Sequence, residues 1–177
     1  MLGIVLHEPE IPFNTGAIGR TCVATGSSLH LIYPLGFALS DKYIKRAGMD
    51  YWSRLDLHKY NDYEDFIERH SNLCFNNEGE SGSKKLWFAT TKARQCYSDV
   101  SFGKDDMIMF GKESAGIPEE ILIRHPDSCI RIPMIGETRS LNLSNSVAIV
   151  LYEALRQNGF AGLNEKGQLH RLSWDLR

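Results

Sequence analysis

Short apolar runs alternate along this chain with segments of helical periodicity, and this alternation restricts the folds available to it. Each run has the length of a buried strand and falls well short of the ~20 apolar residues that cross a bilayer. Strands that alternate with helices predict an α/β domain, whose mostly parallel sheet is covered by helices on both faces. The predicted strands are Leu2–Leu6, Leu29–Tyr33, Lys85–Thr90, Asp106–Phe110 and Ser128–Ile132.

The predicted helices fill the intervals between these strands. The longest, Leu143–Gln157, carries apolar side chains at three- and four-residue spacing, which is typical of a helix with one buried face. A polar stretch with glycine and serine, Asn76–Ser83, is predicted to be a solvated loop. The other predicted helices are Asn14–Thr25, Asp41–Ala47, Asp62–His70 and Pro118–Arg124.

The composition is that of one ordinary globular domain. The chain has 177 residues, of which 42% are hydrophobic and 24% charged, and single cores usually span ~100–200 residues. The apolar segment Met1–Leu6 has neither a basic leader nor a small-residue cleavage site, so we interpret it as a strand and expect a cytoplasmic protein without a membrane anchor. The formal net charge is −2, so any contact with nucleic acid must be local.

The cysteines indicate neither a metal centre nor a disulfide framework. Cys22, Cys74, Cys96 and Cys129 lie far apart, with no Cys-x-x-Cys pair and no His-x₃₋₅-His tract. Zinc sites need such spacings. We therefore expect no bound metal.

Three segments that follow predicted strands are candidates for chemistry, because ligands of such sheets bind beyond the carboxyl ends of the strands. The first runs from Asn14 to Arg20. Asn14 is predicted to cap the helix with its side-chain oxygen. Gly16 and Gly19 each weaken a helix by roughly 1 kcal/mol relative to alanine, so they indicate close approach by another chain or a ligand. The alternative is a capped helix with a solvated arginine.

The second segment runs from Phe110 to Pro118. Gly111, at a strand end, lets the backbone approach a ligand, and Gly116 permits a tight turn before the next helix. The spacing is neither that of a Rossmann fingerprint nor that of a P-loop. A plain strand–turn–helix junction would explain the glycines, but it leaves Glu113 without a role.

The third segment, from Ile130 to Ser146, is a strand, a proline stop and a polar loop that leads into the last helix. The loop offers backbone groups, hydroxyls and amides but few titratable side chains. Such a lining suits adenosine and methionine, which need hydrogen bonds and apolar walls more than charge. An alternative role, compatible with ligand binding by the same loop, is that Asn142 or Ser144 caps the helix.

Three runs of residues, in or next to these segments, follow one another in a fixed order along the chain. They are Glu8-Pro9-Glu10-Ile11-Pro12-x-Asn14-Thr15-Gly16-x-x-x-Arg20, then Phe110-Gly111-x-Glu113-x-x-Gly116-Ile117-Pro118, then Ile130-Arg131-Ile132-Pro133-Met134 with Arg139-Ser140-Leu141-Asn142-Leu143-Ser144-Asn145. In this order they resemble the signature motifs of the SPOUT-class, TrmH-like RNA 2′-O-methyltransferases. The sequence is most similar to the YibK-like branch, also called TrmL, whose members methylate the ribose of the tRNA wobble nucleotide (cytidine or uridine 34).

The resemblance covers about residues 1–159, which we take as the catalytic domain, and leaves 160–177 as a C-terminal tail. It implies an α/β fold whose C-terminal part forms a trefoil knot. S-adenosylmethionine would bind in the knotted loops, and S-adenosylhomocysteine would be the product. The residues that this resemblance assigns to cofactor binding are Ala89, Thr90, Gly111, Gly116, Ile132, Met134, Ser140 and Leu141.

The resemblance also implies the catalytic residues. Arg20 would engage the ribose hydroxyl and the adjoining phosphate. Because arginine normally keeps its proton, we expect it to orient the hydroxyl and stabilise the developing alkoxide rather than act as a base. Asn14, Glu113 and Asn142 would organise the site, while Ser140 and Ser144 would hold the third loop. A basic rim for tRNA phosphates is expected from Lys42, Lys45, Arg46 and Lys92, although scattered lysines are also typical of a solvated surface.

Members of this family act as homodimers, so we expect Arg20 of one chain to serve the cofactor pocket of the other. The apolar stripe of the last helix, Val147 to Ala154, fits a subunit interface, although such a stripe is also typical of intramolecular core. The small residues at 16, 17 and 19 would admit a second backbone.

The chain departs from the family pattern in a few places. The loop 76–83 is longer than usual, the tail extends beyond a minimal member, and Lys112 stands where a proline is common. These departures remove no motif residue, so they bear on substrate choice and not on catalysis. Two alternatives stay open. Because the motifs report on the cofactor pocket more than on the substrate, one is the same chemistry on another tRNA loop or on ribosomal RNA; because a fold does not guarantee a function, the other is a nucleoside-binding module without turnover.

Overall fold

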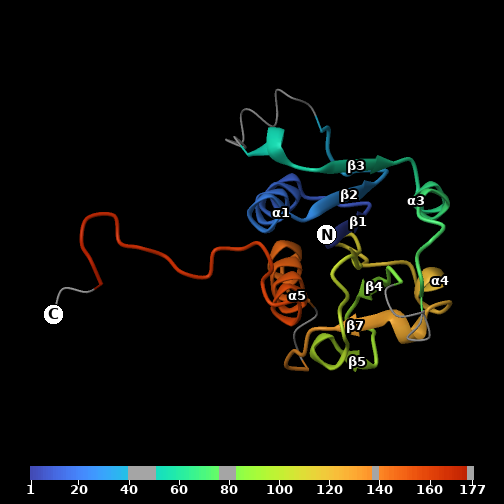
Figure 1. Ribbon diagram of the computed structural model, residues 1–177. Coiled ribbons are helices and arrows are strands. Elements are labelled where there is room, and N and C mark those ends of the chain that lie inside the picture. Colours follow the sequence, from blue (N-terminus) through green and yellow to red (C-terminus); the bar gives the residue numbers. More distant parts are fainter. Residues whose placement is uncertain (40–50, 76–82, 137–139, 175–177) are drawn as a thin grey trace.

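The computed structural model describes residues 1–39, 51–75, 83–136 and 140–174. Its centre is a seven-stranded parallel sheet with the strand order β3-β2-β1-β6-β4-β7-β5 (Figure 1). The first and last strands of this order form the edges. The strands are β1 (Gly3–His7), β2 (Ser28–Ile32), β3 (Leu57–Tyr60), β4 (Leu86–Ala89), β5 (Gln95–Cys96), β6 (Met107–Phe110) and β7 (Cys129–Arg131).

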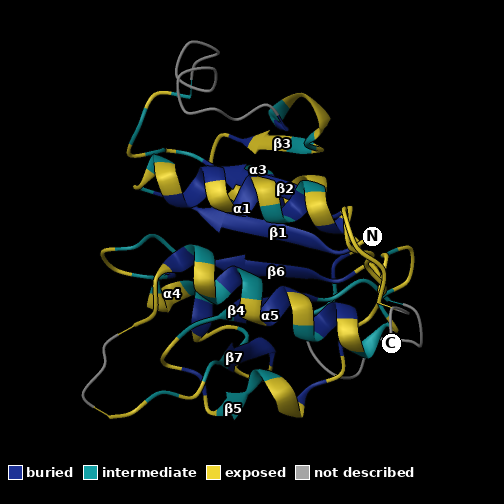
Figure 2. Ribbon diagram, turned by 90° about the vertical axis from the view of Figure 1, so that its left-hand side faces the viewer, coloured by how far each residue is buried: buried dark blue, intermediate teal, exposed yellow. Residues whose placement is uncertain are grey.

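Helices cover both faces of the sheet. Helices α1 (Pro12–Thr25) and α5 (Leu143–Gln157) pack together on one face, and the shorter helices α3 (Tyr63–Arg69) and α4 (Glu119–Leu122) lie on the other (Figure 1). The central strands are therefore buried on both sides (Figure 2). A strand buried on both faces has no polar side, which is why β1 and β6 occur as continuous apolar runs.

The alternation of side chains along the strands divides the core in two. Ile4 and Leu6 of β1 join the cluster beneath α1 and α5, whereas Val5 joins the cluster beneath α3 and α4. The two clusters follow from the two-residue period of a strand. The α/β fold with a parallel sheet is confirmed.

The predicted elements recur with shifts of one or two residues, and α5 has the predicted bounds. Strands β3 and β5 were not predicted, because each is short and lies at an edge of the sheet, where part of its residues remain exposed and no apolar run forms. Three short 3₁₀ segments, Trp52–Arg54, Tyr97–Asp99 and Pro126–Ser128, were also missed. The predicted helix Asp41–Ala47 and all but the last residue of the predicted loop Asn76–Ser83 lie outside the described residues.

The start of α1 corrects one prediction. The helix begins at Pro12, the residue at its N-cap is Ile11, and no side chain of the cap closes the first turn. Asn14 is therefore inside the first turn, and the prediction that it caps the helix was wrong. Proline at the first helical position explains the earlier start, because its fixed φ suits this position and its missing N–H needs no partner there.

The apolar stripe of α5 belongs to the core of the single chain. Val147, Val150, Leu151 and Ala154 have no exposed surface, so the interpretation of this stripe as a subunit interface was wrong and the intramolecular alternative holds. Within the described residues, no helix is long and apolar enough to span a membrane. The trefoil knot stays a prediction.

The chain beyond α5 has no further helix or strand among its described residues. Phe160 and Leu163 still pack against the core cluster of α1 and α5, whereas residues 164–174 are exposed and extend away from the body (Figure 1).

Candidate active site

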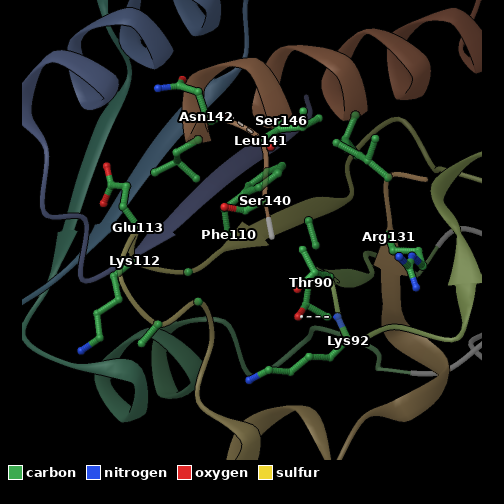
Figure 3. A pocket seen from close by; sticks show the side chains of 18 of the residues that line it. Thr90, Lys92, Phe110, Lys112, Glu113, Arg131, Ser140, Leu141, Asn142 and Ser146 are labelled. Carbon is green, nitrogen blue, oxygen red and sulfur yellow. Dashed lines mark hydrogen bonds between the residues drawn. The ribbon is translucent and has the colours of Figure 1, made fainter. Parts of the chain in front are cut away.

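A cavity of about 580 Å³ opens beyond the carboxyl ends of β4, β6 and β7, where the second and third candidate segments meet the start of α1 (Figure 3). Every residue assigned to the cofactor by resemblance lies in its wall, although in the sequence these residues span more than fifty positions. They are Ala89, Thr90, Gly111, Gly116, Ile132, Met134, Ser140 and Leu141.

The three residues expected to organise the site, Asn14, Glu113 and Asn142, also line this cavity. Of the two serines expected to hold the third loop, Ser140 lines it and Ser144 does not. Further lining residues carry charge, hydroxyl groups or apolar surface that sequence reasoning did not assign to the pocket. Although Arg131 stands in the third motif, only the fold shows that these side chains reach the cavity. They include Lys112, Thr91, Arg131, Ser146 and Val150.

The Glu113 carboxylate joins the second segment to the first. It accepts hydrogen bonds from the backbone N–H of Glu10 at 2.8 Å and of Ile11 at 3.3 Å, and from Asn14 Nδ2 at 2.8 Å. The Ile11 side chain cannot cap α1, and Glu113, from a distant loop, instead holds the backbone N–H groups that lead into the helix. A carboxylate is suited to this position, since the N-terminus of a helix favours negative charge.

Asn14 is also hydrogen-bonded to the third segment. Its Oδ1 accepts a hydrogen bond from Asn142 Nδ2 at 3.0 Å. The Oδ1 of Asn142 in turn accepts from the backbone N–H of Ser144 at 2.9 Å and of Asn145 at 3.4 Å, which confirms the predicted cap of α5. Glu113, Asn14 and Asn142 thus tie the two helix N-termini and the cavity loops into one hydrogen-bonded unit.

A second set of contacts clamps the first two loops together. The Glu10 carboxylate accepts from the backbone N–H and the hydroxyl of Ser114, both at 2.8 Å, and these bonds lower the pKa of Glu10. Lys112 Nζ donates to Glu8 Oε2 at 2.9 Å, which raises the pKa of Lys112. Lys112, at the position where the family commonly has proline, therefore strengthens the joint between the loops.

Glycine is needed at position 111 for a reason that differs in part from the expected approach of a ligand. A Cβ at this position would lie 2.0 Å from the carbonyl carbon of Gly116 and 2.1 Å from the backbone nitrogen of Ile117. The backbone of Gly116 and Ile117 thus occupies the space that a side chain at position 111 would need. Gly116 has φ +74°, a conformation that favours glycine, as the predicted tight turn requires.

The cavity wall is locally positive although the chain as a whole is not. Lys92, Lys112 and Arg131 line it, and among the described lining residues Glu113 is the one carboxylate. Lys92 Nζ also forms a 2.8 Å salt bridge with the exposed Glu119, and this contact lowers the pKa of Glu119. The other three expected rim cations, Lys42, Lys45 and Arg46, lie outside the described residues.

The rest of the wall suits a nucleoside. Ile132, Leu141 and Val150 supply apolar surface, while Ser140 and Ser146 carry hydroxyl groups (Figure 3). This combination of apolar walls and a few polar groups is typical of small-molecule sites. Among the described residues, no group of three or more histidine, cysteine, aspartate or glutamate side chains could hold a metal ion.

Arg20 does not reach this cavity within its own chain. It is exposed, and its guanidinium lies over the ring of Tyr51, 4.9 Å from the ring centre. The close approach that was predicted for Gly19 also comes from the chain itself, because a Cβ there would lie 3.0 Å from Trp52 Cζ3. Arg20 can therefore act on a ligand of such a cavity only in another chain or after a rearrangement.

Comparison with known proteins places these features in a family context. The model of the SpoU rRNA Methylase family matches residues 1–152. A relative from Photorhabdus asymbiotica, named tRNA (cytidine(34)-2′-O)-methyltransferase, is 47% identical over 165 residues, which cover 92% of this chain and 97% of the relative.

Two solved structures are similar in fold. One, described as structural insights into the 2-OH methylation of C/U34 on tRNA, has a TM-score of 0.77 and 40% identity and covers 90% of this chain and 97% of that one. The other, an AdoMet-bound rRNA methyltransferase from Sinorhizobium meliloti, has a TM-score of 0.72 and 26% identity, and covers 88% of this chain and 56% of that one.

Proposed function

Because the chain belongs to the SpoU rRNA Methylase family, we propose that it transfers a methyl group from S-adenosylmethionine to the ribose 2′-hydroxyl of nucleotide 34 in tRNA. Two findings together support the proposal. A relative named as a tRNA methyltransferase is 47% identical over nearly its whole length. The motif residues of this chain line one cavity. The substrate hydroxyl is that of a cytidine or uridine.

The cavity fits the cofactor. Its volume of about 580 Å³ lies within the range of small-molecule pockets. The glycine backbone at 111 and the serine hydroxyls offer hydrogen bonds, and Ile132 and Leu141 offer apolar contacts for the adenine and the methionine chain. When bound, S-adenosylmethionine supplies the methyl group on a sulfonium, which is already a good leaving group.

The protein's own tasks are then to position the ribose and to help its hydroxyl lose a proton. Arg20 orients the hydroxyl and stabilises the negative charge that develops on its oxygen, while the proton passes to phosphate or water, since arginine stays protonated. The unit of Glu113, Asn14 and Asn142 holds the cavity loops in register with helix α1, which carries Arg20.

The working molecule is a homodimer in which Arg20 of one chain completes the cavity of the other. Two observations support this. Arg20 lies outside the cavity of its own chain. Helices α1 and α5 also carry exposed apolar side chains, among them Phe13 at 75% and Tyr152 at 46%. Exposed apolar side chains on neighbouring helices are compatible with a subunit interface.

We further propose that residues 1–159 form the catalytic domain, that 160–177 is a tail, and that the protein acts in the cytoplasm, where tRNA is modified. The trefoil knot would lie in the C-terminal part of this domain, around the cofactor loops.

The test uses tRNA that lacks the wobble 2′-O-methyl group and S-adenosylmethionine labelled in its methyl group. We expect incorporation that maps to nucleotide 34 and is lost when that ribose is replaced by 2′-deoxyribose. Incorporation that survives the replacement would exclude this site. A parallel reaction with ribosomal RNA tests the second candidate, which the family's description favours, and unchanged cofactor with both RNAs would indicate a binding module.

A further inference from the structure

Among the described residues, Arg20 contacts an aromatic ring and no carboxylate, whereas four other cations of the chain are paired with carboxylates. Arg69, Arg156, Lys92 and Lys112 each form a salt bridge with a carboxylate. Within residues 1–39, 51–75, 83–136 and 140–174, Arg20 forms none, and its guanidinium instead lies over the ring of Tyr51 at 4.9 Å. Its neighbour in the described structure is thus an aromatic face.

Tyr51 is firmly fixed beneath this guanidinium. Its side chain is buried, with 6% exposure, and its hydroxyl donates a 2.6 Å hydrogen bond to the backbone carbonyl of Gly16. Gly16 lies four residues before Arg20, about one helical turn away. The adjacent Trp52 packs directly against Gly19. The ring is therefore anchored to the same stretch of α1 that carries Arg20.

The two kinds of partner have different consequences for an arginine. A carboxylate binds the guanidinium through its N–H groups, often two at a time, and neutralises its charge. An aromatic ring attracts the cation through its face and leaves the N–H edges free. An arginine that must engage a ribose hydroxyl and a phosphate needs both its charge and its donors.

We propose that Tyr51 is the positioning residue for Arg20: its ring fixes the guanidinium while leaving all the guanidinium N–H donors available to the tRNA backbone. The inference rests on the proposed function, because it concerns the orientation of the arginine that this function employs. It also gives Gly19 a role, since a Cβ there would lie 3.0 Å from Trp52 Cζ3, in the segment that carries Tyr51.

The experiment compares Tyr51→Phe, which keeps the ring but loses the hydroxyl, with Tyr51→Leu, which loses the ring. A cation–ring contact of about 1–2 kcal/mol corresponds to a rate change of about fivefold to thirtyfold. We expect Tyr51→Leu to lower kcat for tRNA methylation by this factor. Tyr51→Phe should retain most of the wild-type kcat. Affinity for S-adenosylhomocysteine should not change in either variant, because Tyr51 does not line the cavity.

A spectroscopic readout separates positioning from stability. The Nε–H signal of Arg20, identified by its absence in Arg20→Ala, should be displaced by the ring current in the wild type and in Tyr51→Phe. In Tyr51→Leu it should return to the position of a solvated arginine. Tyr51→Met, whose flexible side chain fills similar space, gives the same comparison if Tyr51→Leu does not fold.

The matched control is Tyr97→Leu, which removes a tyrosine packed against the core cluster of α1 and α5 with no cation over its ring among the described residues. It should leave both kcat and the Arg20 signal unchanged. A folded Tyr51→Leu with wild-type kcat, or with the Arg20 signal still displaced, would overturn the inference. Full activity of Arg20→Ala would overturn the proposed role of Arg20 itself, and the inference with it.

Discussion

Asn14 of helix α1 donates its side-chain amide to the Glu113 carboxylate at 2.8 Å, although the two residues are 99 positions apart. The same carboxylate holds the backbone that enters the helix. Glu113 is therefore the acceptor on which the start of α1 depends, and the helix in turn carries Arg20.

Replacement of Glu113 by glutamine should weaken both the fold and the reaction. Glutamine offers one oxygen where the carboxylate uses two, so at least one of three donors loses its partner at a cost of about 1–2 kcal/mol. For a chain of this size we expect the melting temperature to fall by roughly 2–8 °C, together with kcat. Glu119→Gln is the control, because Glu119 is exposed and its salt bridge contributes little. Equal melting curves for the two variants would contradict this role of Glu113.

Gly111→Ala should damage the loop that walls the cavity. Its Cβ would lie 2.0 Å from the Gly116 backbone, and overpacking of this kind typically costs at least 1–3 kcal/mol. We expect a lower melting temperature together with weaker binding of S-adenosylhomocysteine in calorimetry. Gly136→Ala serves for comparison, since nothing lies within 4 Å of the added atom. If Gly111→Ala is as stable as Gly136→Ala, the loop does not need the glycine.

Stability should fall on acidification because of His30. Burial, reinforced by the nearby His58, His70 and Lys84, lowers the pKa of His30 from 6.5 to about 2. Below pH 6.5 the unfolded chain thus binds a proton that the folded chain does not, so stability is full above pH 6.5 and decreases as the pH falls.

Denaturant unfolding at pH 7.5 and pH 5 measures this effect. At pH 5 we expect a loss of about 2 kcal/mol from His30, which corresponds to the 1.5 units below its unfolded pKa. His30→Gln should show a shallower dependence by about this amount, whereas His170→Gln, in the exposed tail, should match the wild type. If His30→Gln loses as much unfolding free energy between pH 7.5 and pH 5 as the wild type, groups other than His30 cause the acid sensitivity.

The proposed shared active site predicts complementation between two inactive variants. Arg20→Ala removes the arginine, and Ala115→Trp places an indole in the cavity wall. After dissociation and random reassembly about half the dimers are mixed, and each has one intact site, which gives about a quarter of wild-type activity. A verified mixed dimer without activity would show that Arg20 serves the cavity of its own chain.

Much of the site could be predicted without the fold. The carboxyl ends of parallel strands meet at one edge of a sheet, so the segments after β4, β6 and β7 had to gather there, and the cofactor residues assigned by resemblance do line one cavity. The bounds of α5 also follow from local signals, namely the Asn142 cap and the apolar period.

The sequence by itself thus determined the fold class, the family and the cofactor residues that line the cavity, because these depend on local periodicity and on motif order. Only the tertiary structure decided what Asn14, Gly19 and Gly111 contact, and that Arg20 stands apart from the cavity on the ring of Tyr51. Those contacts join segments that are distant in the chain. No local pattern records which partner will lie within hydrogen-bonding distance once the strands have taken their places in the sheet.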